Sequence, residues 1–315
     1  IVGNSGEPNR LYLNDGSSAP FESITGVDVT ADANFTQTLE LVDIDSDGDL
    51  DLIEGNRFQL NRIYLNNGTA DPFNGVTGID IVVDLHNTVG IAAGDYDCDS
   101  DIDLVVANAN GPLLLYLNNG TGDPFDAVTP SVLFDYSMAG SDTPSDVAMG
   151  DISGDSFPDI VVGLINSANA YFENNRSGGV VSQLAVGSLF IGFNTSVIEL
   201  ADLNQDGTLD IIEGVNGGQN QLWFNQGPPG MPVGGRTGYF PNFSSGLGND
   251  FSQTRAIAVA DINLDGALDI IAANGTSSNQ EANLLYIGGG SGVFNPFAGT
   301  VGVSYAPDNL ASSGI

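Results

Sequence analysis

Aspartates stand at every second position of residues 43–51, which read DIDSDGDLD. Carboxylates fall at positions 1, 3, 5 and 9 of this loop, glycine at position 6, and a backbone carbonyl at position 7. Oxygen donors at this spacing around a tight bend make a site for a hard cation such as Ca²⁺. His and Cys are missing from these positions, which disfavours zinc and copper. The expected ligands are the side chains of Asp43, Asp45, Asp47 and Asp51 and the carbonyl of Asp49.

The same loop returns at residues 95–103, 151–159, 202–210 and 261–269. Serine replaces the bend glycine in the second and third loops. Five loops in register predict about five Ca²⁺ ions, one per complete loop, and solvated turns that bind weakly or not at all are the alternative. The ligands expected in the four later loops, with the carbonyl donor last in each, are Asp95, Asp97, Asp99, Asp103 and Asp101; Asp151, Ser153, Asp155, Asp159 and Phe157; Asp202, Asn204, Asp206, Asp210 and Thr208; and Asp261, Asn263, Asp265, Asp269 and Ala267.

An EF-hand is a rival explanation of the first and fourth loops, because Glu54 and Glu213 complete its spacing at position 12. The other three loops have Val or Ala there. The flanking segments are β-branched runs broken by Gly and Asn, which do not form EF-hand helices. We therefore expect Glu54 and Glu213 to be strand residues.

The elements that position these loops also repeat. Each loop follows a short stretch of small and apolar residues and precedes a β-branched run. A third strand then carries one aromatic in every repeat: Tyr12, Tyr64, Tyr116, Tyr171, Trp223 and Tyr286. A Pro-Phe pair closes the following turn in four of them: Pro20–Phe21, Pro72–Phe73, Pro124–Phe125 and Pro296–Phe297. We expect the aromatics to pack between blades, with a sugar-stacking surface as the alternative.

Four short strands in about 53 residues, without helical periodicity, predict an all-β fold, a β-propeller of four-stranded blades. Residues 1–315 are expected to form a single propeller domain. Both ends of the sequence fall within a repeat, which suggests a segment removed or omitted before residue 1. Six blades are expected, with the N- and C-terminal strands sharing one, or seven if the chain is incomplete. The repeats are approximately 1–35, 36–87, 88–143, 144–195, 196–252 and 253–309, with 310–315 returning to the first blade.

Charge narrows the range of partners. The chain has 40 Asp and Glu residues against 6 Lys and Arg, a formal charge of −34. Nucleic acid and anionic membranes require a basic surface, so both are excluded as partners. No apolar run approaches the ~18–20 residues of a membrane span. Bound Ca²⁺ is the expected counter-charge, with a structural role, because an ion that binds only the folded state stabilises it.

The sequence offers few candidate catalytic residues. The chain has one histidine, His86, and one cysteine, Cys98, which lies inside the second loop. Nearly half of the acidic residues, 19 of 40, belong to the five loops. We expect a protein that is not an enzyme.

Binding is the favoured activity. Asn- and Gly-rich turns between the second and third strands are candidates for carbohydrate or protein recognition, although ordinary polar turns have the same composition. The long Gly- and Pro-rich stretch 226–250 is a candidate specificity or assembly loop. Asn-x-Ser/Thr sequons predict glycosylation in a eukaryotic secretory protein. They lie at Asn34, Asn67, Asn119, Asn175, Asn194, Asn242 and Asn274.

The loop D-x-[DN]-x-D-G-x-x-D, followed by G-N…N-x-L-Y-L-N-N-G, resembles the FG-GAP/VCBS repeats of integrin-α-type β-propellers. The resemblance covers essentially the whole chain and implies calcium in the blades and ligand-binding loops on the ring. The FG…GAP sequence motif itself is absent, which argues against a specifically integrin-like partner. The resemblance to this family implies an extracellular or cell-surface, calcium-stabilised propeller for adhesion or for binding a carbohydrate or an extracellular protein. The alternatives are a self-assembling segment of a larger secreted or fibrous surface glycoprotein, and the propeller of a polysaccharide-degrading enzyme.

Overall fold

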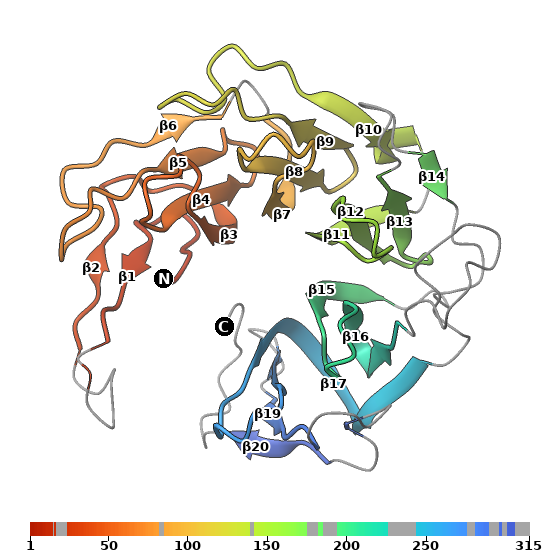
Figure 1. Ribbon diagram of the computed structural model, residues 1–315. Coiled ribbons are helices and arrows are strands. Elements are labelled where there is room, and N and C mark those ends of the chain that lie inside the picture. The colour runs from red at the N-terminus through yellow and green to blue at the C-terminus, as the bar shows by residue number, and fades with distance from the viewer. Residues whose placement is uncertain are drawn as a thin grey trace. The chain divides into compact units, whose positions relative to one another are not determined.

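β-Strands make up almost all of the regular structure in the computed structural model of this chain (Figure 1). It describes residues 1–14, 16, 24–81, 85–138, 142–174, 182–184, 194–225, 244–275, 281–289, 296–297 and 301–305. Within these ranges the one helix is a short 3₁₀ turn, η1 (Tyr136–Met138). The predicted all-β class is confirmed. The chain divides into two compact units, Ile1–Ser137 and Met138–Ile315, and the single domain over 1–315 stays a prediction.

The first unit contains two four-stranded antiparallel sheets in which each strand pairs with the next in the sequence. One sheet has the order β3 (Thr36–Val42), β4 (Asp51–Asn56), β5 (Arg62–Tyr64) and β6 (Ile79–Asp80). The other has β7 (Thr88–Gly94), β8 (Asp103–Asn108), β9 (Pro112–Tyr116) and β10 (Ser131–Asp135). A smaller sheet pairs β1 (Arg10–Leu11) with β2 (Val27–Asp28). These meanders are the four-stranded blades that the repeats predict.

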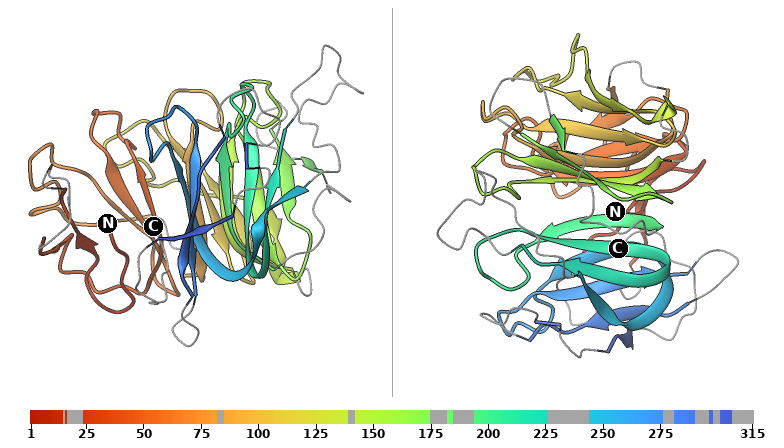
Figure 2. Two further views of the ribbon diagram at one scale, coloured as in Figure 1. Left: turned by 90° about the horizontal axis from the view of Figure 1, so that it is seen from below. Right: turned by 90° about the vertical axis from the view of Figure 1, so that its right-hand side faces the viewer.

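The second unit begins with a further blade of the same order: β11 (Thr143–Gly150), β12 (Asp159–Ile165), β13 (Ala170–Glu173) and β14 (Ser182–Leu184). A six-stranded sheet follows, and its long curved strand is visible in Figure 2. Its strands are β15 (Thr195–Ala201), β16 (Asp210–Trp223), β17 (Ser244–Ala260), β18 (Asp269–Asn274), β19 (Asn283–Tyr286) and β20 (Val303–Tyr305).

β17 runs across the repeat boundary that the sequence places between residues 252 and 253. Gln253 pairs with Asn216 of β16, and the next residue, Thr254, pairs with Asn274 of β18. The strand leaves one hairpin and enters the next without a turn. The expected boundary therefore lies inside a continuous strand.

Each aspartate loop joins the first two strands of a repeat in the same register. The last residue of the first strand pairs with the position-9 aspartate, which begins the second strand. An irregularity in pairing also recurs near the start of the first strand, as between Thr36 and Thr38. The five pairs between the last residue of the first strand and the position-9 aspartate are Val42–Asp51, Gly94–Asp103, Gly150–Asp159, Ala201–Asp210 and Ala260–Asp269.

The core lies along the second and third strands. Every residue of β4 and β8 is buried, because each strand has a neighbour on both edges and side chains packed on both faces. Most of the repeated aromatics lie in this core, at 0–3% exposure for Tyr64, Tyr116, Trp223 and Tyr286. Tyr12 differs, with 39% of its surface exposed. The buried members confirm the predicted packing role.

The Pro-Phe turns add to the same core. Phe73, Phe125 and Phe297 are 2–4% exposed, and the Phe125 ring lies edge-on to Tyr116 with centroids 6.1 Å apart. Phe21 lies outside the described residues. No helix in the described ranges has the length and apolar character needed to span a membrane.

Candidate metal centres and ligand-binding turns

The first aspartate of each loop closes the bend. In the first loop, Asp43 Oδ1 accepts a hydrogen bond from the backbone N–H of Asp47 and Oδ2 accepts one from Gly48, both at 3.0 Å. The loop is therefore shaped by its own backbone. The same pair of bonds, at 2.8–3.1 Å, is made by Asp95, Asp151, Asp202 and Asp261.

The bend needs left-handed backbone at two positions, and the sequence indicated only one. Position 6 has φ between 73° and 97° in all five loops, whether it is Gly or Ser. Position 4 is also left-handed, with φ from 58° to 74°. Its residues are Ser46, Cys98, Gly154, Gln205 and Leu264. The exposed Cys98 therefore has a backbone role in the bend.

The position-9 aspartate is a buried clamp. Asp51 accepts the backbone N–H of Ile44 at 3.0 Å and that of Asn66, just after the third strand, at 2.7 Å. It thus ties the loop to the end of the third strand. The matching residues Asp103, Asp159, Asp210 and Asp269 make the same two kinds of bond at 2.8–3.0 Å, and all five are 0–1% exposed.

Burial strongly affects the protonation of these clamps. Desolvation raises the pKa of Asp103 and of Asp159 to about 6, and that of Asp210 to about 7, although backbone N–H groups favour the charged form. A cation nearby favours the carboxylate and opposes this shift. The clamp is therefore a group whose charge a bound cation would stabilise.

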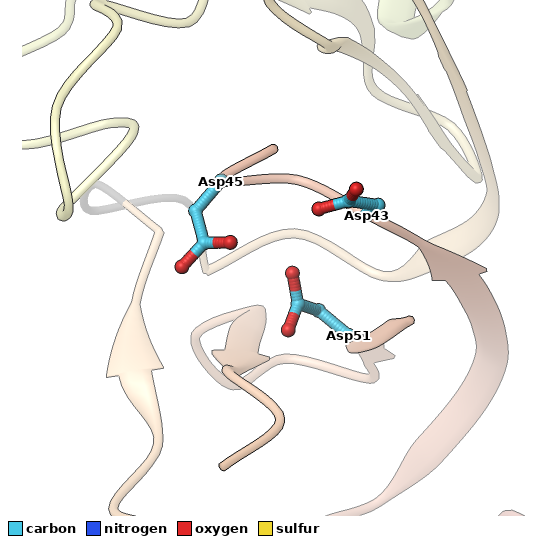
Figure 3. Close-up of side chains that lie close together, drawn as sticks. All are labelled: Asp43, Asp45 and Asp51. Atoms are coloured by element: carbon cyan, nitrogen blue, oxygen red, sulfur yellow. The ribbon is translucent and has the colours of Figure 1, made fainter. Parts of the chain in front are cut away.

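Carboxylates converge in the first two loops. In Figure 3 Asp43, Asp45 and Asp51 point toward one another, and one oxygen of each lies within 4.8 Å of the others. Asp95, Asp97 and Asp99 form a similar group in the second loop. Burial and then the neighbouring Asp47 and Asp99 charges raise the pKa of Asp45 and Asp97. An all-oxygen donor set with uncompensated negative charge fits Ca²⁺.

The third, fourth and fifth loops have fewer carboxylates, because position 3 is Ser153, Asn204 or Asn263. No trio of acidic groups gathers in these loops among the described residues. Their position-1 and position-9 aspartates nevertheless keep the geometry of the first two loops. A Ca²⁺ ion in these loops would depend more on neutral oxygen donors.

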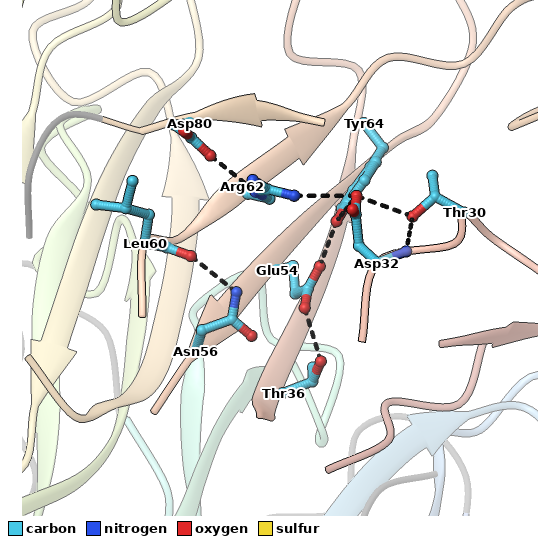
Figure 4. A network of polar contacts seen from close by, with 9 residues as sticks. All are labelled: Thr30, Asp32, Thr36, Glu54, Asn56, Leu60, Arg62, Tyr64 and Asp80. Atoms are coloured by element: carbon cyan, nitrogen blue, oxygen red, sulfur yellow. Dashed lines mark hydrogen bonds and ion pairs between the residues drawn. The ribbon is translucent and has the colours of Figure 1, made fainter. Parts of the chain in front are cut away.

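Glu54 and Glu213 take no part in the loops. Glu54 lies on β4, 1% exposed, and accepts hydrogen bonds from Thr36 Oγ1 at 2.7 Å and from Tyr64 Oη at 2.8 Å (Figure 4). Glu213 lies on β16 and accepts one from Trp223 Nε1 at 3.1 Å. Glu213 also accepts a hydrogen bond from Thr195 Oγ1 on β15, so each of these strand residues connects neighbouring strands by buried polar bonds. The prediction against an EF-hand is confirmed, since strands flank both loops.

The network around Glu54 extends to the sheet edge. Tyr64 Oη also contacts Asp32 at 3.2 Å. Arg62 lies between Asp32, at 3.0 Å, and Asp80, at 2.7 Å (Figure 4). Burial and the Glu54 charge raise the pKa of Tyr64, so its hydroxyl stays a donor to the carboxylate. These contacts join residues of three sequence segments within the first unit.

The turns between the second and third strands use their asparagines internally. Asn56 N–H donates to Asn61 Oδ1 at 2.8 Å, and Asn56 Nδ2 donates to the Leu60 carbonyl at 2.9 Å. Asn4 and Asn9 repeat this arrangement. Asn56 and Asn61 are 0–1% exposed. These amides hold the turn and are not available to a ligand, so any recognition by these turns must use residues at their tips.

The described sequons differ in how accessible the side-chain nitrogen is. Asn67 and Asn119 are exposed, but each Nδ2 already donates to two backbone carbonyls of its own turn. The nitrogens of Asn34 and Asn274 are buried, and Asn194 donates to the Asn216 carbonyl at 3.4 Å. A glycan on Asn274 would require its turn to open. Glycosylation stays a prediction, and Asn175, Asn242 and the stretch 226–243 lie outside the described residues.

Comparison with known proteins agrees with this geometry. The FG-GAP-like repeat family matches residues 43–106, 97–162 and 202–272, together more than half of the chain. No curated protein matches the chain. Among solved structures, an Agrocybe aegerita lectin that recognises non-reducing terminal N-acetylglucosamine has a TM-score of 0.60 at 20% identity, covering 99% of this chain and 78% of that one.

Two further structures share the fold. BBS1N in complex with ARL6DN has a TM-score of 0.51 at 13% identity, with 87% of this chain and 70% of that chain covered. Raptor of Chaetomium thermophilum has a TM-score of 0.51 at 11% identity, with 90% and 24% covered. At these identities the likeness concerns the fold alone. With the four-stranded sheets and the repeats it confirms the β-propeller class, while the number of blades stays a prediction.

Proposed function

The chain belongs to the FG-GAP-like repeat family, and we propose from this that it is a calcium-stabilised β-propeller, extracellular or on the cell surface, that binds a ligand and catalyses no reaction. The observation that carries the calcium part is the convergence of Asp43, Asp45 and Asp51 in a loop that recurs at the same register of every complete repeat. Millimolar calcium outside cells suits sites of this kind.

The chain's own residues prepare the sites. Position-1 aspartates shape the bend through two backbone N–H groups, and position-9 aspartates anchor it to the third strand. A bound Ca²⁺ would supply positive charge that offsets the mutual repulsion of the carboxylates. Because the ion binds the folded loop, each site filled at about 100 times its Kd adds about 2.7 kcal/mol to the free energy of unfolding.

Thermal melting tests the calcium proposal. The melting temperature should rise in excess Ca²⁺ and fall in excess EDTA, and Asp45→Ala should shrink this difference. Asp71→Ala, which removes an exposed acid outside the loops, serves as control. Identical melting curves in Ca²⁺ and in EDTA would rule the proposal out.

For the ligand, we propose a carbohydrate. The similar Agrocybe aegerita lectin recognises terminal N-acetylglucosamine, and loops held by a rigid scaffold are common positions for binding residues. A protein partner is the second candidate, favoured by the similarity to BBS1N, which was solved in complex with ARL6DN. A glycan array carrying N-acetylglucosamine-terminated and other oligosaccharides, probed in Ca²⁺, tests the first candidate. Absence of binding to every saccharide on the array would reject it.

A further inference from the structure

One turn of the first unit carries an aromatic side chain in a backbone conformation that disfavours it. Four described turns between second and third strands share a hydrogen bond from a backbone N–H to an Asn Oδ1 five residues on. In each of these turns, the residue two positions after the one that donates this N–H has a left-handed backbone conformation. The residue there is Gly6, Asn166 or Gly217 in three of the turns, with φ of 80°, 60° and 79°. In the fourth it is Phe58, with φ of 54°.

Gly and Asn are the residues that tolerate this conformation, whereas a bulky side chain is a genuine outlier. Packing does not offset the strain, because 62% of the Phe58 surface is exposed. A backbone bond from Phe58 N–H to the His86 carbonyl, 2.8 Å long, holds the conformation. Strain of this kind, retained where it does nothing for the core, makes Phe58 a candidate functional residue, and its neighbours decide whether a ligand could bind there.

A second exposed aromatic and a cation accompany Phe58. The Arg57 guanidinium lies over the Phe58 ring, 5.6 Å from its centroid. Arg57 N–H donates to the Phe35 carbonyl at 2.9 Å, and Gln59 Oε1 accepts the Phe35 N–H at 2.6 Å. Phe35 is 48% exposed. Two hydrogen-bonded chain segments thus carry two exposed aromatic side chains and one guanidinium, and we name Phe35, Arg57 and Phe58 the Phe58 patch.

The Phe58 patch departs from the repeat at two positions. Phe35 immediately precedes Thr36, which begins the first strand of the second repeat. The residues before the matching threonines of three later repeats are polar: Asn87, Asn194 and Gln253. The scaffold therefore does not need an aromatic at either position. The two replacements lie on two segments that are joined by hydrogen bonds.

Arg57 is also available to a ligand. Arg10 and Arg62 are held in ion pairs with Asp28, Asp32 and Asp80. Arg57 is exposed and has no ion pair within the part of the chain that the structure describes. Its guanidinium carries five N–H donors in a fixed plane. It can donate to hydroxyl or carbonyl oxygens of a molecule that covers the neighbouring rings.

We propose that the Phe58 patch is a saccharide-binding site, in which the apolar face of a sugar ring lies on the exposed aromatic rings and Arg57 donates hydrogen bonds to its oxygens. This deepens the proposed function and rests on it. Aromatic surface with a few convergent polar groups is the usual composition of a small-molecule site. The net charge of −34 repels polyanions, so we expect a neutral or N-acetylated sugar.

A macromolecular partner fits the patch less well. Stable protein interfaces bury roughly 800 Å² on each partner, whereas this feature consists of three side chains in an acidic surface. A second copy of the chain brings the same negative charge, which opposes self-association through this face. A small neutral ligand avoids both difficulties.

The decisive variant is Phe58→Asn, which installs the residue found at the matching position of the turn containing Asn166. The probes are neutral, N-acetylated and uronic-acid-terminated oligosaccharides on an array, followed by calorimetric titration of the strongest binder. We expect Phe58→Asn to lose at least tenfold in affinity while its melting temperature rises, because the backbone strain is relieved. Arg57→Gln should also weaken binding.

Leu264→Asn is the matched control, because Leu264 is an 87% exposed apolar residue with φ of 61° in an aspartate loop. It should raise the melting temperature and leave saccharide affinity unchanged. Unchanged affinity in Phe58→Asn overturns the site while the proposed function stands. A wild-type protein that binds no saccharide overturns both this site and the proposed carbohydrate ligand. One that binds only a protein partner does the same and supports the second candidate ligand. A melting temperature that falls in Phe58→Asn overturns the argument from strain.

Discussion

The position-9 aspartate is an ionisable side chain that is also fully buried, and these two properties ordinarily conflict. Asp103 is 1% exposed, and both of its carboxylate oxygens accept backbone N–H groups, from Tyr96 and Asn118, at 2.8 Å. Burial of a charge is unfavourable, and these bonds are what make it tolerable. The residue therefore has a scaffold role even before any cation is considered.

Asp103→Asn should consequently destabilise the protein by about 2 kcal/mol, because an amide NH₂ would face a buried N–H donor. The measurement is urea unfolding in EDTA, which removes any contribution from calcium. Asp101→Asn in the same loop is the control, since only its backbone carbonyl has an expected role. Equal losses in the two variants would contradict the clamp.

Glu40 provides a test of pH dependence. It is half-buried on β3, and desolvation raises its pKa to about 7 from an ordinary value of 4.5. The folded state therefore holds the proton more tightly than the unfolded chain does. The stabilising effect of that proton is present below pH 4.5 and is lost as the pH rises through about 7. Above that pH, the charged Glu40 destabilises the fold.

Glu40→Gln should raise the free energy of unfolding at pH 8 by about 1–2 kcal/mol and change it little at pH 4. Urea unfolding of both proteins at the two pH values measures the difference. Glu7→Gln, at an exposed position, controls for the loss of one negative charge. A gain of equal size at both pH values would exclude desolvation of Glu40 as the cause.

At the scale of elements, buried polar bonds join strands that backbone pairing already holds. Glu54 on β4 accepts from Thr36 on β3 and from Tyr64 on β5, so one carboxylate contacts three adjacent strands. A carboxylate without these donors would be strongly unfavourable in the core. The three strands are therefore expected to depend on one another energetically.

A double-mutant cycle measures this dependence. Tyr64→Phe should cost about 1–2 kcal/mol, and the cycle with Glu54→Gln should give a coupling of about 1 kcal/mol. Unfolding in saturating Ca²⁺ provides the data. Tyr12→Phe, at the same repeat position but 39% exposed, should cost less than about 0.5 kcal/mol. Additive effects of Tyr64→Phe and Glu54→Gln would show that the bond contributes nothing.

For the molecule as a whole, the sequence predicted the features that recur. The aspartate loops, the strands beside them and the buried aromatics follow from patterns repeated five or six times. Each pattern can be predicted because the same residue types recur at the same spacing in several repeats. The clamp at Asp51 does not follow from the repeat pattern, because its partner Asn66 is 15 residues away, just after the third strand. The left-handed backbone at position 4 was missed since Ser46, Cys98 and Leu264 share no residue type. The strain at Phe58 shows only in its φ angle.

The continuity of β17 matters to anyone who would shorten or lengthen this protein. Residues 244–253 belong to one hairpin and residues 254–260 to the next, on a single uninterrupted strand. Deleting or duplicating a repeat at residue 252 would cut that strand and leave two sheets with frayed edges. A cut between the third and fourth strands, as within residues 65–78, would leave every strand whole. The modules from which such a protein can be recombined are therefore offset from the repeats that its sequence displays.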